Sequence, residues 1–156
     1  MAPELGECQA GVYAAENDAL SGLGIRWRRV AEAQAYADRL VGSAWFGERW
    51  PHFLHCAVQR RGSGSVWSLS HPFDASGPGG RPTEGLILLA DGAAAQEVLL
   101  HELAHLLAPP DAGHGPGFVD VHLDLVRAEM GFFAFAGYRD ALRARVPAAV
   151  AGAVSG

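Results

Sequence analysis

The 156-residue sequence has no long apolar run and few positive charges. No stretch approaches the roughly 18 to 20 apolar residues that a membrane-spanning helix needs. Residues 1–7 have neither the basic region nor the apolar segment of a secretory signal. We therefore expect a cytoplasmic protein with no membrane partner.

Cysteine is scarce, with only Cys8 and Cys56. In a chain without an export signal, two cysteines are expected to be free thiols and not a disulfide. Neither has a second cysteine or a histidine at the spacing of a zinc finger. Cys56 lies in an apolar run, which predicts a place in the core.

Basic clusters are limited to Arg26-Trp27-Arg28-Arg29 and Arg60-Arg61. The net charge is −5 and the isoelectric point is near 5.7, opposite to the usual charge of a DNA-binding domain. Nucleic acid is therefore not expected as a partner. The two clusters are interpreted as solvated ends of secondary structure.

The chain length fits one compact domain. A chain of this size buries about two-thirds of its extended surface, which is enough for one core without stabilising disulfides or structural metal ions. Residues 147–156 are small and uncharged. The sequence thus predicts a single domain over residues 1–146 and a flexible tail over residues 147–156.

One motif carries chemistry, His101-Glu102-Leu103-Ala104-His105. An α-helix advances 3.6 residues per turn, so two histidines four residues apart can bind one tetrahedral metal ion. The carboxylate of Glu102 can then take a proton from a water molecule on that metal. The motif predicts zinc as cofactor, His101 and His105 as ligands, and Glu102 as general base.

The surrounding segment predicts an uninterrupted helix over residues 93–107. It contains no glycine or proline, it is rich in alanine and leucine, and Asp91 is placed to cap its start. Its apolar face would consist of leucines (Leu99, Leu100, Leu103, Leu106 and Leu107). Histidine and glutamate buried in such a helix need a partner, and a metal ion provides one. The alternative is a solvated stripe on a surface helix.

A third ligand is expected from the chain that follows, with His114 as the first candidate. Residues 109–113 predict a turn, which leads into a second helix over residues 117–130 and returns the chain toward the first helix. Gly113 and Gly115 flank His114. They permit the positive φ angles and the close backbone approach that a ligand in a tight turn requires.

Other third ligands stay open at this point. Asp111 lies six residues after His105, at the spacing used by metallopeptidases with the long motif His-Glu-x-x-His-x-x-Gly-x-x-His or Asp. Ala108 stands where that motif has glycine, and alanine does not readily take a positive φ. Glu129 and Asp124 on the second helix are further carboxylate candidates.

The run from His101 to Phe118, with Gly113-His114-Gly115-Pro116-Gly117-Phe118 after the first helix, resembles the His-Glu-x-x-His plus His-Gly-x-x-Phe arrangement of SprT-like zincin metallopeptidases. It is also similar to a group of small actinobacterial proteins described as metallohydrolases. The resemblance implies zinc ligation by His101, His105 and His114. It further implies that Glu102 is the general base and that Phe118 packs behind the site.

The remaining pattern predicts an α+β fold, a minimal zincin-like domain in which a small mixed β-sheet packs on the metal-binding helix. Helices are expected over residues 9–20 and 31–41, where apolar residues recur at helical intervals. Strands are expected over residues 53–59, 65–70 and 86–89.

The last of these strands, residues 86–89, bears on substrate binding. Peptidases of this broad architecture bind an extended substrate along a sheet edge through main-chain hydrogen bonds. A short apolar run is compatible with an edge and with an interior strand, so both positions stay open. Residues 71–85 are rich in glycine and proline and predict a loop, either a rim or lid over a site or a disordered segment.

Together these features predict a zinc-dependent metallopeptidase acting on a peptide or protein. Tyr138, His122, His71 and Arg81 qualify by residue type as oxyanion donors, but no spacing selects one. His122 is expected to be a hydrogen-bonded interior residue. The alternatives are a zinc-binding interaction or regulatory module without hydrolytic activity and a zinc amidohydrolase acting on a small molecule. A structural zinc site needs four protein ligands and no base, which favours an enzyme.

Overall fold

The computed structural model describes residues 5–62, 64–65 and 67–150. The elements are α1 (Leu5–Leu20), α2 (Val30–Val41), α3 (Ala44–Arg49), β1 (His55–Arg60), β2 (Leu69–Pro72), the 3-10 helix η1 (Pro78–Gly80), β3 (Glu84–Leu89), α4 (Gln96–Leu107), α5 (Pro116–Met130), α6 (Phe132–Arg145) and α7 (Pro147–Val150). The expected α+β class is confirmed. The zincin-like identity stays a prediction.

The chain divides into two compact units. Unit 1 comprises Met1–Gly24 and Asp111–Gly156, and unit 2 comprises Ile25–Pro110. Each unit is described by itself below. The expectation of one domain over residues 1–146 stays a prediction.

Unit 2 is built around a three-stranded mixed sheet. The strand order is β1-β3-β2, with β1 parallel and β2 antiparallel to β3. The β1–β3 register runs from the pair His55 and Glu84 to the pair Arg60 and Leu89. The expected mixed sheet is therefore confirmed, and β3 is its central strand. Of the two positions left open for residues 86–89, the interior one is correct.

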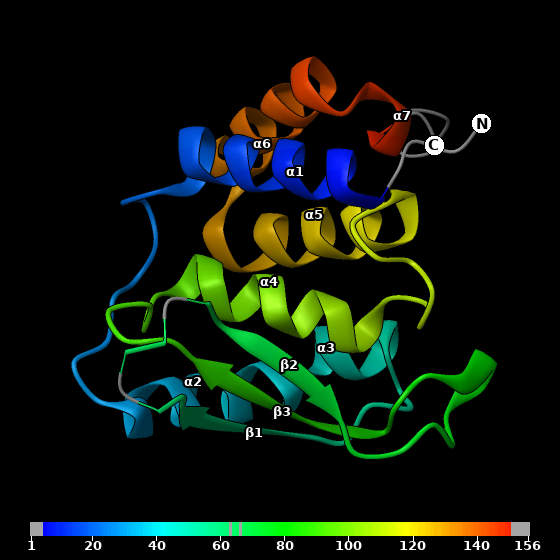
Figure 1. The fold of residues 1–156 in the computed structure, drawn as a ribbon. Coiled ribbons are helices and arrows are strands. Elements are labelled where there is room, and N and C mark those ends of the chain that lie inside the picture. The colour runs from blue at the N-terminus through cyan, green and yellow to red at the C-terminus, as the bar shows by residue number, and fades with distance from the viewer. Residues whose placement is uncertain (1–4, 63, 66, 151–156) are drawn as a thin grey trace. The chain divides into compact units, whose positions relative to one another are not determined.

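Helix α4 packs along one face of this sheet (Figure 1). The side chains of Ile87 and Leu89 on β3 and the five leucines of α4 are each at most 2% exposed. Gly85 permits the close approach, because a Cβ atom there would lie 2.7 Å from Leu106 Cδ1 and 3.2 Å from the main-chain oxygen of His71. Burial of this apolar face fixes the orientation of α4.

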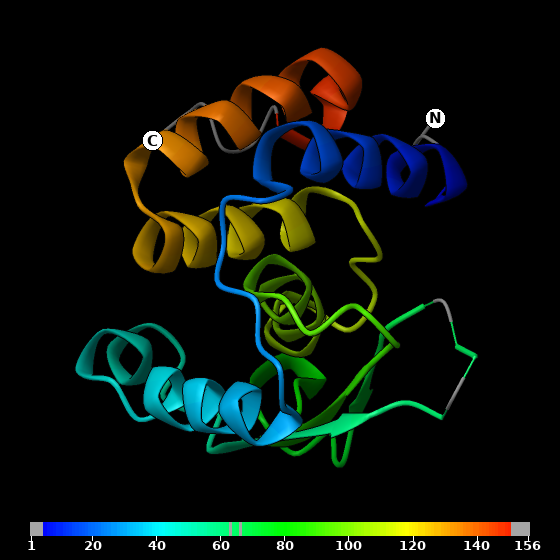
Figure 2. The same cartoon turned by 90° about the vertical axis from the view of Figure 1, so that its left-hand side faces the viewer.

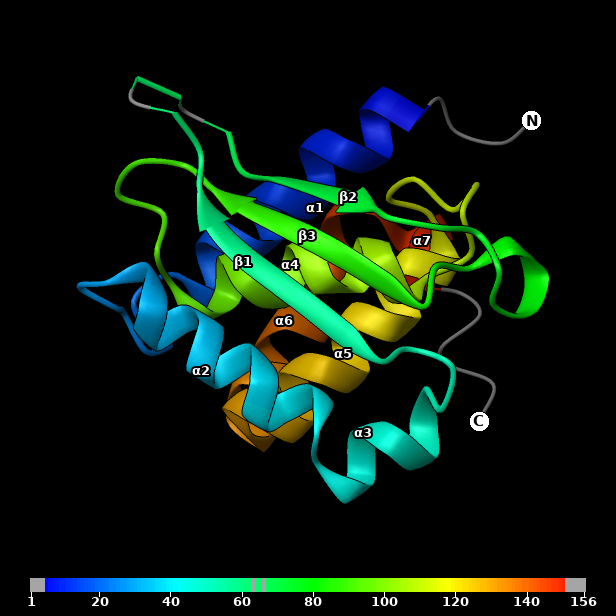
Figure 3. The same cartoon turned by 90° about the horizontal axis from the view of Figure 1, so that it is seen from below.

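Helix α2 runs beside β1, at the sheet edge opposite β2 (Figure 3). The side-chain amide of Gln34 binds the main chain of β1 on that side. Its Nε2 donates to the Cys56 carbonyl at 2.9 Å, and its Oε1 accepts from the Val58 N–H at 2.6 Å. The amide takes the place of a neighbouring strand at this position of β1, and β2 forms the other edge of the sheet.

In unit 2, the predicted starts of two elements are wrong by three residues or more. The strand expected over residues 65–70 is β2, which begins only at Leu69. Helix α4 begins at Gln96 and not at residue 93, and Asp91 does not cap it. The Asp91 carboxylate instead accepts hydrogen bonds from Arg60 Nη2 at 2.9 Å and from the Gly64 N–H at 3.2 Å. These long-range partners hold Asp91 away from the helix start.

The loop expected over residues 71–85 is shorter than predicted, because its ends belong to β2 and β3. The Asp74 carboxylate organises it. This carboxylate accepts hydrogen bonds from the main-chain N–H and hydroxyl of Thr83, at 2.9 and 2.8 Å, and from the same two groups of Ser76. Hydrogen bonds from Thr83, and then from Ser76, hold the pKa of Asp74 well below its ordinary value. The loop thus has a defined structure.

Unit 1 consists of helices. In Figure 2, α1 (blue) lies beside α6 (orange), and α5 (yellow) packs against α6. The helices expected over residues 9–20 and 117–130 are confirmed as α1 and α5 with small changes of boundary. Of the expected tail, residues 147–150 form α7 with Ala149 and Val150 buried, while residues 151–156 lie outside the described residues.

Both cysteines are free, and Cys56 is buried, as expected. Cys8 is buried as well. Cys56 is 1% exposed, and burial raises the pKa of its thiol to about 12, with a smaller contribution from Asp38. Such a thiol stays protonated and unreactive at neutral pH. Among the described helices, none combines the length and the hydropathy that crossing a bilayer needs.

Candidate metal centre

Helix α4 brings His101 and His105 together within unit 2. Their side chains leave the helix one turn apart, and their Nε2 atoms lie 3.2 Å from each other. The ring centroids are 4.9 Å apart, with an interplanar angle of 69°. The two imidazoles therefore direct one nitrogen each at the same small volume, as their spacing in the sequence predicts.

This separation fits a shared metal ion. Two nitrogens bound to one tetrahedral zinc ion at about 2.0–2.1 Å lie about 3.3–3.4 Å apart. The observed distance of 3.2 Å between the two Nε2 atoms is within a few tenths of an ångström of that value. It also lies at the long end of the range for a hydrogen bond between the rings, in which one ring donates and the other accepts.

The ionisable residues of α4 are withdrawn from solvent. His101 is 3% exposed and Glu102 is 6% exposed, while His105 is partly exposed. The alternative of a solvated stripe on a surface helix is therefore wrong. Charged and polar groups are costly to bury without a compensating partner. The burial of His101 and Glu102 therefore favours a binding site in which a partner compensates these side chains.

His114 belongs to unit 1, on the turn before α5, and is 9% exposed. Its ring packs against Tyr13 and Phe118, with centroid distances of 5.4 and 5.0 Å. The expectation for Gly113 is confirmed, because its φ is +54°. The expectation for Gly115 is wrong in this respect. Its φ is −79°, and it serves as the N-terminal flanking residue of α5.

The carboxylate alternatives to His114 are also in unit 1. Asp111 is exposed on the same turn as His114. Asp124 and Glu129 lie 8 and 13 residues after Pro116, the first residue of α5. With a rise of 1.5 Å per residue, they are about 12 and 20 Å along the helix axis from its start. Both stay alternatives to His114, because either would replace it at the metal ion and not join it.

A second polar group lies inside unit 1, where α1, α5 and α6 meet. The His122 ring is fully buried, and its Nδ1 lies 2.8 Å from the Tyr138 hydroxyl and 3.3 Å from Glu16 Oε1. Burial, and then the charge of Glu16, raises the pKa of Tyr138 well above its ordinary value. The expectation that His122 is a hydrogen-bonded interior residue is confirmed.

Sequence reasoning missed Glu16. It lies on α1, more than 100 residues before its partners, and half-buried between Ala15 and an exposed Asn17. Its position beside the small buried Ala15 gives only a weak signal. A carboxylate in contact with a buried histidine is visible only once the helices are packed.

The other oxyanion candidates lie in different environments. His71 is exposed on β2. Arg81 donates from Nε to the Leu107 carbonyl at 3.3 Å, which satisfies a free carbonyl at the C-terminal end of α4 and places a positive charge there. Tyr138 is fully buried, with its hydroxyl engaged by His122. Tyr138 and Arg81 thus have structural partners.

The chain matches no known family model, no curated protein and no solved structure. The resemblance to SprT-like metallopeptidases therefore stays a prediction based on the motif residues.

The buried Tyr138 gives a testable pH dependence. Because its folded pKa is raised, neutral Tyr138 favours the fold below the unfolded pKa of about 10, and this contribution is lost as the pH rises above that value. We expect absorbance at 295 nm to show the Tyr138 phenolate only when the protein unfolds. Tyr138→Phe should remove one phenolate from the absorbance change on unfolding and lower the free energy of unfolding by about 1–2 kcal/mol. Reversible ionisation of Tyr138 near pH 10 in the folded protein would contradict this assignment.

Proposed function

We propose that the chain is a zinc-dependent metallopeptidase. In this proposal His101, His105 and His114 hold the metal ion, and Glu102 is the general base. The observation that carries it is the 3.2 Å approach of two imidazole nitrogens on a buried helix, with a carboxylate in the next position of the sequence. A structural zinc site has no use for such a base.

His114 is proposed as the third ligand because its side chain is an imidazole and because a short segment of chain joins it to His105. It is an imidazole on a turn only nine residues after His105, and nine residues span at most about 30 Å. Contact with Phe118 and Tyr13 fixes the orientation of its ring. Three histidines with an open fourth position are a common ligand set of catalytic zinc.

The proposed reaction is hydrolysis of a peptide bond. A zinc ion held by His101, His105 and His114 would acidify a water molecule and polarise the carbonyl group of the substrate. Glu102 accepts a proton from the water as its oxygen forms a bond to the carbonyl carbon. Glu102 then delivers that proton to the amide nitrogen as the carbon–nitrogen bond breaks, which leaves a carboxylic acid and an amine.

The proposed path of the substrate follows the outer edge of β2. Phe73 donates its N–H to the Glu84 carbonyl at 3.0 Å, so these residues form a hydrogen-bonded antiparallel pair. Because such pairs alternate along a ladder, the N–H and carbonyl of Ser70 point away from β3. An extended peptide pairing with Ser70 would lie beside α4, which packs on β2 and β3.

The cellular setting is part of the proposal. Two buried free thiols, one of them with a raised pKa, suit a reducing compartment such as the cytoplasm. The proposed partner there is a peptide or an unfolded protein segment, because only an extended chain can pair with a sheet edge.

Metal analysis tests the proposed ligand set. We expect the purified chain to retain about one zinc ion, and His101→Ala, His105→Ala and His114→Ala each to lose most of it. Asp111→Ala is the matched control on the same turn and should retain zinc. Loss of zinc in the Asp111 variant alone would overturn the assignment of His114.

Activity measurements test the proposed base. Glu102→Gln keeps the shape and one acceptor oxygen of the side chain but cannot accept the proton, so we expect zinc content to be unchanged and kcat to fall by about 10²- to 10⁴-fold on a peptide library. If wild type and variant both hold zinc and are equally inert on every peptide, the chain is not a peptidase. The interaction-module and small-molecule alternatives then gain support.

Substitutions of Ser70 test the substrate path. Ser70→Pro removes the outward N–H while fitting an edge strand, and should lower kcat/KM for extended peptides by roughly tenfold, the cost of one main-chain hydrogen bond. Ser70→Ala keeps that N–H and should behave as wild type. Equal activity of the proline variant on long peptides would exclude pairing at β2.

A further inference from the structure

Two arginine-rich segments that are far apart in the sequence meet in unit 2. Strand β1 ends at Arg60, and the segment before α2 is held against the residues before α4. The Trp27 N–H donates to the Ala94 carbonyl at 2.8 Å, and the Gln96 N–H donates to the Ile25 carbonyl at 2.8 Å. The fold thereby places Arg26 to Arg28 opposite the end of β1.

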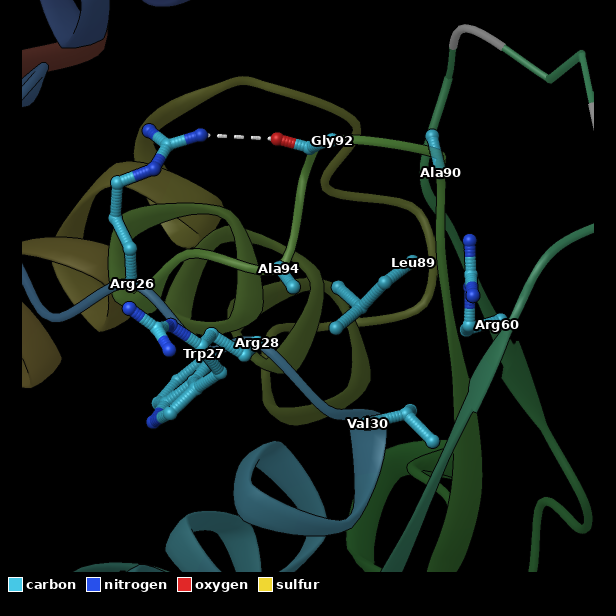
Figure 4. A pocket seen from close by; sticks show the side chains of 9 residues that line it. All are labelled: Arg26, Trp27, Arg28, Val30, Arg60, Leu89, Ala90, Gly92 and Ala94. Atoms are coloured by element: carbon cyan, nitrogen blue, oxygen red, sulfur yellow. Dashed lines mark hydrogen bonds between the residues drawn. The ribbon is translucent and has the colours of Figure 1, made fainter.

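A pocket of about 240 Å³ lies between these segments. Figure 4 shows Arg26, Trp27 and Arg28 on one side of it and Arg60 across from them. The rest of the lining is mostly apolar (Val30, Leu89, Ala90, Gly92 and Ala94). The pocket therefore combines guanidinium groups with an apolar wall.

The three guanidinium groups give the pocket a positive charge. Arg60 pairs with Asp91 at 2.9 Å, and Arg26 donates from Nη2 to the Gly92 carbonyl at 3.0 Å. Each guanidinium has five N–H donors, so these single bonds leave others for a ligand. Two carboxylates lie beside these three cations, because Asp91 pairs with Arg60 and Glu32 accepts from the Arg28 N–H at 3.0 Å. The balance is a charge of +1, although the whole chain carries −5.

The sequence contains no lysine, so its permanently charged basic side chains are all arginines. Arginine offers a planar fork of donors that matches the two oxygens of a carboxylate. Trp27 adds a half-buried aromatic surface whose position is fixed by contact with Tyr36, at a centroid distance of 5.1 Å. The lining thus suits a flat anionic group joined to an apolar body.

We infer that this pocket binds a carboxylate on a short apolar stem, such as an acidic side chain or the terminal carboxyl group of a peptide. The inference rests on the proposed function, because it makes the pocket a specificity site for the metallopeptidase substrate. A polyanion such as nucleic acid fits less well, since the pocket is small, one wall is apolar and the chain as a whole is acidic.

The pocket lies at the beginning of the metal-binding helix. Ala94 in its lining comes two residues before α4, and Gln96 to His101 is about 7–8 Å along the helix axis. An extended peptide covers about 10–14 Å with three or four residues. The bound carboxylate is therefore expected three or four residues from the bond that is cleaved.

Equilibrium binding to the full chain tests this inference without turnover. The Glu102→Gln variant is titrated with three fluorescent peptides of one sequence: one with an internal glutamate and an amidated end, one with glutamine there and an amidated end, and one with glutamine and a free terminal carboxyl group. We expect at least one carboxylate peptide to bind about tenfold more tightly than the neutral peptide. The comparison of the first and third peptides identifies the source of the carboxylate.

Arginine variants locate the binding. In the same Glu102→Gln background, Arg28→Gln should abolish the tenfold preference, because Arg28 lines the pocket and is exposed enough to be replaced without unfolding. Arg29→Gln removes the same charge from the neighbouring exposed position outside the pocket and should keep the preference. Raising the salt concentration should weaken the binding of the carboxylate peptides and leave the binding of the neutral peptide unchanged.

Several outcomes would overturn the inference. These are equal binding of all three peptides, an equal effect of Arg28→Gln and Arg29→Gln, and stronger competition by inorganic phosphate or a single-stranded oligonucleotide than by acetate. Failure of the peptidase proposal gives a different result, since the binding preference does not need cleavage. Cleavage of acidic and neutral peptides at equal rates by the wild-type chain would contradict the specificity role alone.

Discussion

The candidate metal centre depends on the approach of two imidazole nitrogens to 3.2 Å on α4. Two nitrogen lone pairs that face each other at this distance would repel. A proton shared between the rings, or a metal ion bound by both, removes the conflict. The leucine face of α4 and the glycine at position 85 hold the helix against the sheet and so keep the rings in this arrangement.

Much of the helical architecture could be predicted from the sequence. The apolar repeat of α2, the turn and proline before α5, and the leucine face of α4 are local signals, and the helices form where these signals place them. The spacing of His101 and His105 likewise fixes their meeting, because both lie on one helix.

The features that depend on distant partners could not be predicted. Asp91 has the residue type and position of a helix cap, but Arg60 and Gly64 compete successfully for its carboxylate. The start of β2 and the interior position of β3 depend on strand pairing, which no local pattern specifies. The contact of Glu16 with His122 joins residues more than 100 positions apart.

Within unit 2, the features relevant to a peptide substrate occupy connected elements. The open edge of β2 offers main-chain groups, α4 carries the imidazole pair and the carboxylate, and the arginine pocket lies where β1 and β3 end and α4 begins. On the opposite edge, Gln34 satisfies the Cys56 carbonyl and the Val58 N–H. The sheet thus has one edge suited to pairing, next to the helix that carries the proposed chemistry.

X-ray absorption at the zinc edge of the zinc-loaded full chain tests the central claim most directly. The account predicts nitrogen ligands at about 2.0–2.1 Å with the outer-shell scattering of imidazole rings, and loss of this pattern when His101 and His105 are replaced by alanine. Zinc bound through sulfur at about 2.3 Å, or an imidazole pattern that survives the double replacement, would contradict it.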